Sequence, residues 1–189
     1  IHADIKQNFK ITPAQLEAAI TPKTKLVFFN SPSNPSGKIY SKQEFQALGE
    51  VLLKYPNIMI LTDDIYEHII WGSEPFFNIV MAVPELYERT IVMNSLSKVY
   101  AMTGWRIGYA AASKKIIEVM TTIQSQSTSC PCSISQAAAT AALSPEMTRF
   151  IPPMVKAFRE RQDYLYQELN SMKGVHILPG DGTFYALPD

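Results

Sequence analysis

The amino-acid sequence predicts an α/β fold in which a mainly parallel sheet is flanked by helices. Short, fully apolar runs alternate along the 189 residues with segments that carry helix-capping signals. Such apolar runs are typical of strands that lie between two layers of helices. Hydrophobic residues make up 47% of the chain and charged residues 18%, which excludes a disordered chain. The length is sufficient for one domain of ordinary size with a sizeable core.

The first half of the chain alternates between strands and capped helices. Two capping-box patterns, Thr12 with Gln15 and Ser41 with Glu44, predict the first turns of two helices, the second running to about residue 55. Three apolar runs are expected to form buried strands: residues 26–29, 58–61 and 90–94.

The second half begins with a fourth expected strand, at 105–112, and is then mainly helical from Ser113 to about residue 172. Two further short strands are expected at 175–178 and 184–187. The last helix has apolar side chains on one face, namely Phe158, Leu165, Leu169 and Met172.

Three polar segments follow directly on three of the expected strands. They are residues 30–37, 63–66 and 95–98. In open α/β sheets, ligands bind just beyond the carboxyl ends of the strands. The three segments therefore predict a ligand site at one edge of the sheet.

Charge and cysteine content exclude several classes of function. Lysine plus arginine and aspartate plus glutamate both number 17, so no nucleic-acid or membrane partner is expected. The uncharged run 119–145 contains Pro131 and many hydroxyl and amide side chains, which excludes a membrane span. Cys130 and Cys132 are too close to bridge well, and with three scattered histidines they predict no metal site. No secretory leader opens the sequence, so a cytoplasmic location is expected.

Three familiar motifs are incomplete. A phosphate-loop ending at Gly37 fails because Pro32 stands where the first glycine is needed and Ile39 replaces the magnesium-binding hydroxyl. A dinucleotide fingerprint, G-x-G-x-x-G, is absent. Ser-x-x-Lys at 95–98 also marks penicillin-binding serine enzymes, but their downstream Lys-Thr-Gly element is missing.

The three polar segments together carry a more specific pattern. Asn-Pro-Ser-Gly at 34–37 is followed by Asp-x-x-Tyr at 63–66, then by Ser-x-x-Lys at 95–98 with an arginine eight residues later. In this order the motifs strongly resemble the class I aminotransferases, the fold-type-I pyridoxal-phosphate enzymes of the aspartate aminotransferase kind. The resemblance extends over essentially the whole chain, including 124–128 and 182–185.

The resemblance implies a catalytic role for three residues. Lys98 would form the Schiff base with the cofactor aldehyde and later carry a proton, which requires an amine that can be neutral. Asp63 would pair with the protonated pyridine nitrogen and keep the ring electron-accepting. Tyr66, with Asn34, would donate hydrogen bonds to the phenolate oxygen of the ring. Asp64 ends the same strand as Asp63, but the spacing to Tyr66 favours Asp63.

The same resemblance implies a phosphate-binding group. Arg106 would hold the phosphate through its planar fork, and Ser95 would donate to it. Ser97 would assist.

The function implied is that of an amino acid:2-oxo acid aminotransferase that uses pyridoxal phosphate in a ping-pong cycle, of the aspartate or aromatic type. Two alternatives stay open. One is a lyase or synthase of the same fold that acts at Cα or Cβ, and the other is a non-catalytic binding module.

The resemblance also implies how the chain fits into a larger protein. Residues 1–189 would be the central part of a pyridoxal-phosphate-binding large domain, incomplete at both ends and entering the small domain after about residue 150. The expected assembly is a homodimer with 124–128 near the interface, and the 189 residues alone are expected to be inactive.

Overall fold

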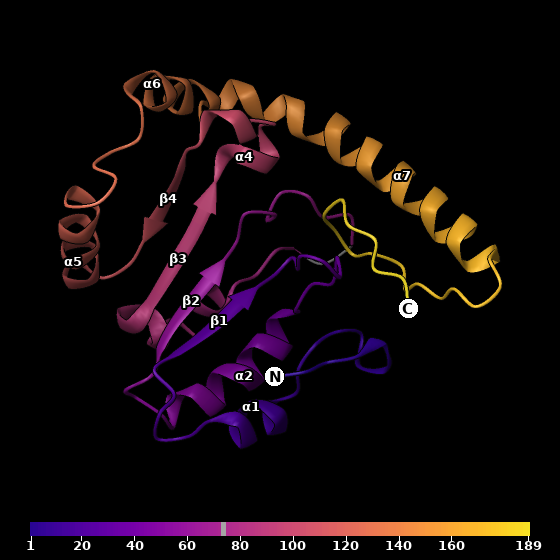
Figure 1. Cartoon of the computed structure of the whole chain (residues 1–189), viewed down its shortest axis with the longest axis horizontal. Helices are drawn as coiled ribbons and strands as arrows, with labels where there is room; N and C mark the ends of the chain where they lie inside the picture. Colours follow the sequence, from indigo (N-terminus) through magenta and orange to yellow (C-terminus); the bar gives the residue numbers. More distant parts are fainter. Residues whose placement is uncertain (73–74) are drawn as a thin grey trace.

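A four-stranded sheet forms the centre of the computed structural model, which describes residues 1–72 and 75–189 (Figure 1). The strands lie in chain order, β1-β2-β3-β4. The first three are parallel to one another, and β4 is antiparallel to β3. The mainly parallel sheet predicted from the sequence is therefore confirmed. The bounds of the strands are β1 Leu26–Asn30, β2 Met59–Asp63, β3 Thr90–Ser95 and β4 Gly108–Ala111.

The two helices with predicted capping boxes begin where those patterns place them. In both, the side chain of the N-cap residue, Thr12 or Ser41, accepts a hydrogen bond from the backbone N–H three positions later, at Gln15 or Glu44. The side chain of that later residue accepts from the backbone N–H of the N-cap residue. The α-helices are α1 Pro13–Ala19, α2 Lys42–Leu53, α3 Ile79–Ala82, α4 Leu96–Val99, α5 Lys114–Ser125, α6 Ser133–Ala142 and α7 Ile151–Ser171. Short 3-10 helices are η1 Ile5–Gln7, η2 Pro84–Arg89, η3 Thr103–Trp105 and η4 Pro145–Phe150.

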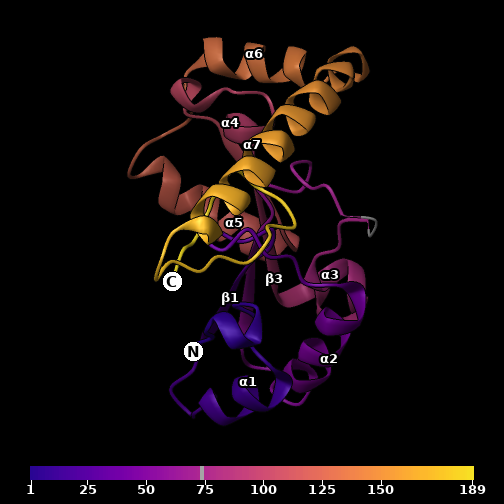
Figure 2. The ribbon, with the colours of Figure 1, turned by 90° about the vertical axis from the view of Figure 1, so that its right-hand side faces the viewer.

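One face of the sheet carries the main hydrophobic core. Phe29 and Ile60 point to this face, and Phe29 meets Phe45 of α2 edge to face at 5.7 Å between ring centroids. The helices α1, α2 and α3, with η2 directly after α3, form a layer that holds the other core residues (Figures 1 and 2). These core residues are Leu16, Leu48, Val51, Leu52, Ile79, Ala82, Val83 and Leu86.

The opposite face of the sheet is much less buried. Leu26 and Phe28 alternate with the core residues along β1 and are 49% and 58% exposed. The expectation of a sheet covered on both faces is therefore confirmed for one face only within the described residues. The polar ends of the strands, where the ligand site is predicted, share this open face.

The structure corrects two details of the second half. Trp105 ends η3, and the fourth strand begins only at Gly108. Residues 175–178 and 184–187 do not form strands, and two isolated antiparallel bridges hold this segment instead, Ile70 with Gly182 and Ile177 with Pro188. The apolar residues of α7 have the expected spacing, and the buried residue among the fully described positions of this helix is Gln162.

The segment after α7 folds back onto the loops at the carboxyl ends of the strands (Figure 1). The backbone of Thr183 donates to Ile69 at 2.7 Å, and that of Asp181 donates to Gly37 at 3.0 Å. The C-terminal residues thus contact the loops that carry the predicted site. In the part of the chain that the structure describes, no helix has the length and apolar character needed to cross a membrane.

Candidate functional site

The ends of β1, β2 and β3 bring the predicted site residues to one edge of the sheet. Asn30 and Asp63 are register partners at the last position of β1 and β2. The Asn30 side chain donates to the Asp63 carbonyl at 3.2 Å and accepts from the Asn34 backbone at 2.6 Å. Asn30 was not predicted as a site residue, yet it fixes the Asn-Pro-Ser-Gly loop to the strand that carries Asp63.

Asp63 and Asp64 point to opposite faces of the sheet because successive strand side chains alternate. Asp64 is 1% exposed and accepts from Thr62 at 2.7 Å and from Asn78 at 2.6 Å. Burial raises its pKa to about 6, against these two hydrogen bonds. Asp63 lies on the open face, on the same side as Phe28. This separation agrees with the selection of Asp63 over Asp64 made from the spacing to Tyr66.

An open cavity of about 570 Å³ lies beside Asp63. Its lining contains four of the seven predicted site residues, with neighbours from β3, β4 and the segment after α5. Those four are Asp63, Ser95, Ser97 and Arg106. A carboxylate, two hydroxyl groups and a guanidinium thus meet around one volume that is large enough for a small organic ligand.

The Asp63 carboxyl group has a raised pKa because it is partly removed from water. The opposing influence is weaker and comes from the backbone N–H of Ile65, which donates to it at 3.3 Å. No cation among the described residues lowers this pKa. A positively charged ligand group next to Asp63 would therefore favour its ionised form.

Ser95, Ser97 and Arg106 form the other side of the cavity. Ser95 caps α4, accepting from the Ser97 backbone at 3.0 Å, and its hydroxyl lies 2.8 Å from the Ser97 hydroxyl. Arg106 is exposed, has a left-handed backbone with φ 52°, and donates to the Thr103 carbonyl at 2.9 Å. Within the described ranges Arg106 makes no salt bridge, so most of its donors can serve an anion.

Lys98 and Tyr66 do not line this cavity but lie near the same edge. Lys98 is on the short helix α4, and its Nζ atom lies 5.6 Å from the centre of the Phe184 ring. No carboxylate of residues 1–72 or 75–189 is within salt-bridge distance of its amine.

Tyr66 is 3% exposed, and its hydroxyl lies 2.7 Å from that of Tyr185. Its pKa is raised by burial first and then by Tyr185 and Asp63, while the Asn34 amide lowers it. The predicted residues Asn34, Asp63 and Tyr66 are therefore electrostatic neighbours. Tyr185 lies in the segment 182–185, which resembles the class I aminotransferases, but no local pattern in the sequence predicts it as a partner of Tyr66.

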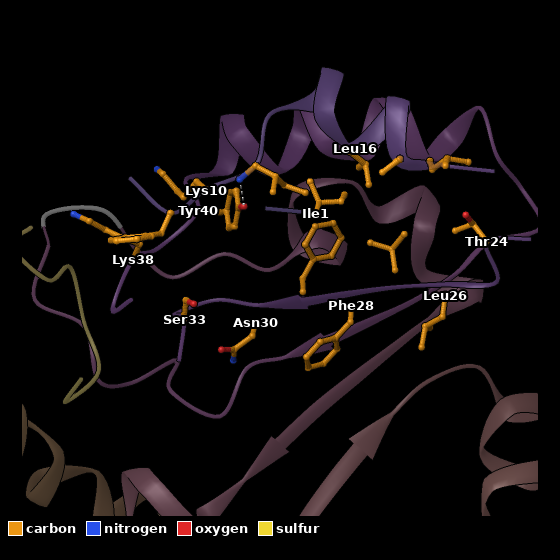
Figure 3. Close-up of a pocket in the computed structure, with 16 residues that line it drawn as sticks. Ile1, Lys10, Leu16, Thr24, Leu26, Phe28, Asn30, Ser33, Lys38 and Tyr40 are labelled. Atoms are coloured by element: carbon orange, nitrogen blue, oxygen red, sulfur yellow. Dashed lines mark hydrogen bonds between the residues drawn. The ribbon is translucent and has the colours of Figure 1, made fainter. Parts of the chain in front are cut away.

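A second cavity, of about 420 Å³, lies on the outer side of β1 (Figure 3). It is lined mostly by apolar side chains, and three of its polar side chains already have partners. Lys10 binds Glu44, Lys38 donates to the Pro179 carbonyl at 2.7 Å, and Tyr40 accepts from the Ile11 backbone at 2.8 Å. This cavity offers little to a charged ligand and is not the candidate site.

Among the described residues, no group of three histidine, cysteine, aspartate or glutamate side chains is placed to hold a metal ion. The histidines and cysteines do not line the cavity beside Asp63. The groups that the cavity presents are the carboxylate of Asp63, the hydroxyls of Ser95 and Ser97 and the guanidinium of Arg106.

Comparison with known proteins gives a consistent result. Residues 1–189 match the family model described as "Aminotransferase class I and II". The aspartate/prephenate aminotransferase of Nitrosomonas europaea is 54% identical over the whole chain, which covers 47% of that protein. That of Cereibacter sphaeroides is 49% identical, again with 47% covered. The chain thus spans about half the length of these curated relatives.

Solved structures agree with this match. The aspartate aminotransferase of Rhizobium meliloti superposes on the whole chain with a TM-score of 0.95 at 43% identity, and 47% of that structure is covered. The Thermus thermophilus aspartate aminotransferase with maleate superposes on 99% of the chain with a TM-score of 0.91 at 34% identity, and 48% of it is covered.

Proposed function

Since the chain belongs to the class I and II aminotransferases, we propose that it is the central part of an amino acid:2-oxo acid aminotransferase that works by a ping-pong cycle. Members of this family are pyridoxal-phosphate enzymes. The aspartate/prephenate names of the relatives support an aspartate or aromatic amino acid as the amino donor. When bound, the cofactor supplies an electron-accepting ring and a carbon that carries the amino group between the two acids.

The donor groups in this chain fit pyridoxal phosphate. Its phosphate needs hydroxyl and guanidinium donors, and Ser95, Ser97 and Arg106 carry such groups on one side of the cavity. Ser95 would turn its single proton from the Ile107 carbonyl, 2.8 Å away, to the phosphate. Its protonated ring nitrogen needs a carboxylate, which Asp63 provides on the other side. Asp63 also has no cation partner among the described residues, and the ring nitrogen would supply that missing charge.

Lys98 and Tyr66 would act on the same molecule from the edge of the sheet. We assign Lys98 the covalent attachment of the cofactor and the transfer of the substrate Cα proton. Tyr66 keeps its proton well above neutral pH because of its burial, so it can donate to an anionic oxygen of the cofactor. Asn34, a neighbour of the Tyr66 hydroxyl, would donate to the same oxygen.

One observation supports the proposal most strongly: Asp63 shares a cavity with Ser95 and Arg106, while Asp64 is buried on the other face. Alternation along β2 produces this difference and leaves one carboxylate free for a ligand. An arrangement made only for stability would give Asp63 a partner of its own.

Three wider features belong to the same proposal. Residues 1–189 would lie within the cofactor-binding large domain and enter the small domain after about residue 150. The assembly would be a homodimer in the cytoplasm, with 124–128 on the interface side. Gln124 supports a site near the interface, because it lines the cavity beside Asp63. The substrates would be an amino acid and a 2-oxo acid.

The proposal is tested with the full-length protein that contains this chain. Aspartate or phenylalanine labelled with ¹⁵N is incubated with 2-oxoglutarate and pyridoxal phosphate, and the products are analysed by mass spectrometry. We expect ¹⁵N-glutamate from the wild type, none from Lys98→Ala, and normal yields from Lys115→Ala, which alters an exposed lysine on α5. Consumption of the amino acid without labelled glutamate would favour the lyase or synthase instead.

A further inference from the structure

The C-terminal segment brings two aromatic side chains to the proposed cofactor-binding residues. The Tyr185 hydroxyl lies 2.7 Å from that of Tyr66, across 119 positions of sequence. The Phe184 ring packs edge to face on Tyr66 with 5.6 Å between centroids, and Lys98 lies 5.6 Å above the same ring. Both residues thus touch groups to which we assign catalytic roles, although they come from the far end of the chain.

Backbone hydrogen bonds fix this segment in place. Thr183 is fully buried, has a left-handed backbone with φ 67°, and donates to the Ile69 carbonyl at 2.7 Å. Its hydroxyl accepts from the Tyr185 backbone at 3.2 Å. Gly182 donates to the Gly37 carbonyl at 3.1 Å. Tyr185 is therefore held by the turn after Tyr66 and by the Asn-Pro-Ser-Gly loop.

The direction of the bond between the two phenols depends on what else Tyr66 binds. A phenol has one proton to donate and can also accept. An anionic cofactor oxygen would take the single proton of Tyr66, and Tyr185 must then donate to Tyr66 for the 2.7 Å contact to persist. Consecutive hydrogen bonds of one direction polarise and strengthen each other.

We propose that Tyr185 is a positioning residue that donates to the Tyr66 hydroxyl and thereby strengthens the hydrogen bond of Tyr66 to the phenolate oxygen of the cofactor. The role rests on the proposed function, since it requires an anionic acceptor in front of Tyr66. It also couples the segment after α7 to the cofactor, so a movement of this segment away from Ile69 and Gly37 weakens the hold on the cofactor.

Charged and polar groups around the pair also act on the Tyr66 proton. Burial and the negative charge of Asp63 raise the pKa of Tyr66, while the Asn34 amide lowers it. Lys98 lies against the Phe184 ring, close to the two phenols. A hydrogen bond donated by Tyr185 to the Tyr66 oxygen would make Tyr66 a stronger donor to an anionic acceptor.

The test compares Tyr185→Phe with the wild type in the full-length protein, with Tyr164→Phe as the matched control. Tyr164 is 62% exposed on α7 and loses only a surface hydroxyl. The first readout is the pH titration of the absorbance of the bound cofactor, which reports how strongly Tyr66 stabilises the phenolate oxygen. We expect the bound cofactor to lose its proton at higher pH in Tyr185→Phe and at the wild-type pH in Tyr164→Phe.

The second readout is the affinity for pyridoxal phosphate. The loss of one hydrogen bond predicts affinity about 2- to 10-fold weaker in Tyr185→Phe, with no change in Tyr164→Phe. An unchanged titration of the bound cofactor together with unchanged affinity would overturn the role of Tyr185. A wild type that takes up no cofactor on Lys98 would instead overturn the proposed function and this inference together, so the two failures are distinguishable.

Discussion

The two faces of the sheet are built from the same strands, yet they differ in almost every physical respect. On one face, Phe29, Ile60 and Thr62 are at most 4% exposed and are covered by α1, α2 and α3. On the other, Leu26 and Phe28 are about half exposed, and the strand ends carry Asp63 and Ser95. The first face holds the fold together, whereas the second presents functional groups at its edge.

The difference shows that the alternation of side chains along a strand places residues that stabilise the fold on one face and residues of the candidate site on the other. Asp63 and Asp64 are adjacent in the sequence, but alternation sends one to each face. Asp64 is bound by Thr62 and Asn78 and ties β2 to the start of α3. Asp63 faces the cavity and accepts from the Ile65 backbone. Three pairs of variants test this difference between the two faces of the sheet.

The largest expected effect is on the stability of the 189-residue chain. Phe29→Ala removes a buried ring from the core and should lower the free energy of unfolding by about 3–5 kcal/mol. Phe28→Ala, one position earlier, removes a ring that is 58% exposed and should cost less than about 1 kcal/mol. Urea unfolding of both variants measures the difference. Equal losses would show that the open face contributes to the fold as much as the buried face does.

The second effect concerns the pH dependence of stability. The pKa of Asp64 rises from about 3.8 to about 6 on folding, so its contribution is present below about pH 4 and is lost as the pH rises through 6. The shift corresponds to roughly 3 kcal/mol. Asp64→Asn should remove this loss, because an amide can still accept from Asn78 and donate to Thr62.

The measurement for Asp64 is a series of urea unfolding experiments between pH 4 and 7. Asp64→Asn should gain stability relative to the wild type as the pH rises, while Asp163→Asn, on the exposed side of α7, should run parallel to the wild type. A pH profile of Asp64→Asn parallel to the wild type would mean that Asp64 does not carry a buried charge.

The smallest effect lies at the helix starts. Ser41 caps α2, which covers the buried face, and accepts from the Glu44 backbone at 3.2 Å. Ser41→Ala should therefore cost about 1 kcal/mol. Ser113 precedes α5 without a side-chain cap and with no buried residue in that fully described helix, so Ser113→Ala should cost only a few tenths. Calorimetric unfolding of both variants measures the two losses of stability. A larger loss in Ser113→Ala than in Ser41→Ala would contradict the assignment of the caps.

Most of the fold could be predicted because its local signals are strong. The capping boxes at Thr12 and Ser41 and the apolar strands gave element positions to within about two residues. Two features escaped because they depend on distant contacts. Residues 175–178 and 184–187 have strand-like composition but form no ladder in the described structure, where single bridges join Ile70 to Gly182 and Ile177 to Pro188. The apolar residues of α7 have helical spacing, but no described element packs on them closely enough to bury them.

The residues of the candidate site that belong to a sequence motif could be predicted. Asp63, Ser95, Ser97 and Arg106 came from the family resemblance and share one cavity in the structure. Their chemical roles remain proposals. Asn30 and Tyr185 could not be found in the same way, because Asn30 binds the Asp63 carbonyl in the next strand and Tyr185 binds Tyr66 from far along the chain. Contacts between residues so far apart produce no recognisable spacing pattern in the sequence.

The most direct test of the central claim is the chemical trapping of the cofactor on Lys98. The full-length protein is incubated with pyridoxal phosphate, reduced with borohydride and digested, and the labelled peptide is identified by mass spectrometry. We predict a label on Lys98, strongly reduced by Asp63→Asn and unaffected by Lys115→Ala. A specific label on another lysine, with none on Lys98, would contradict the assignment of the site.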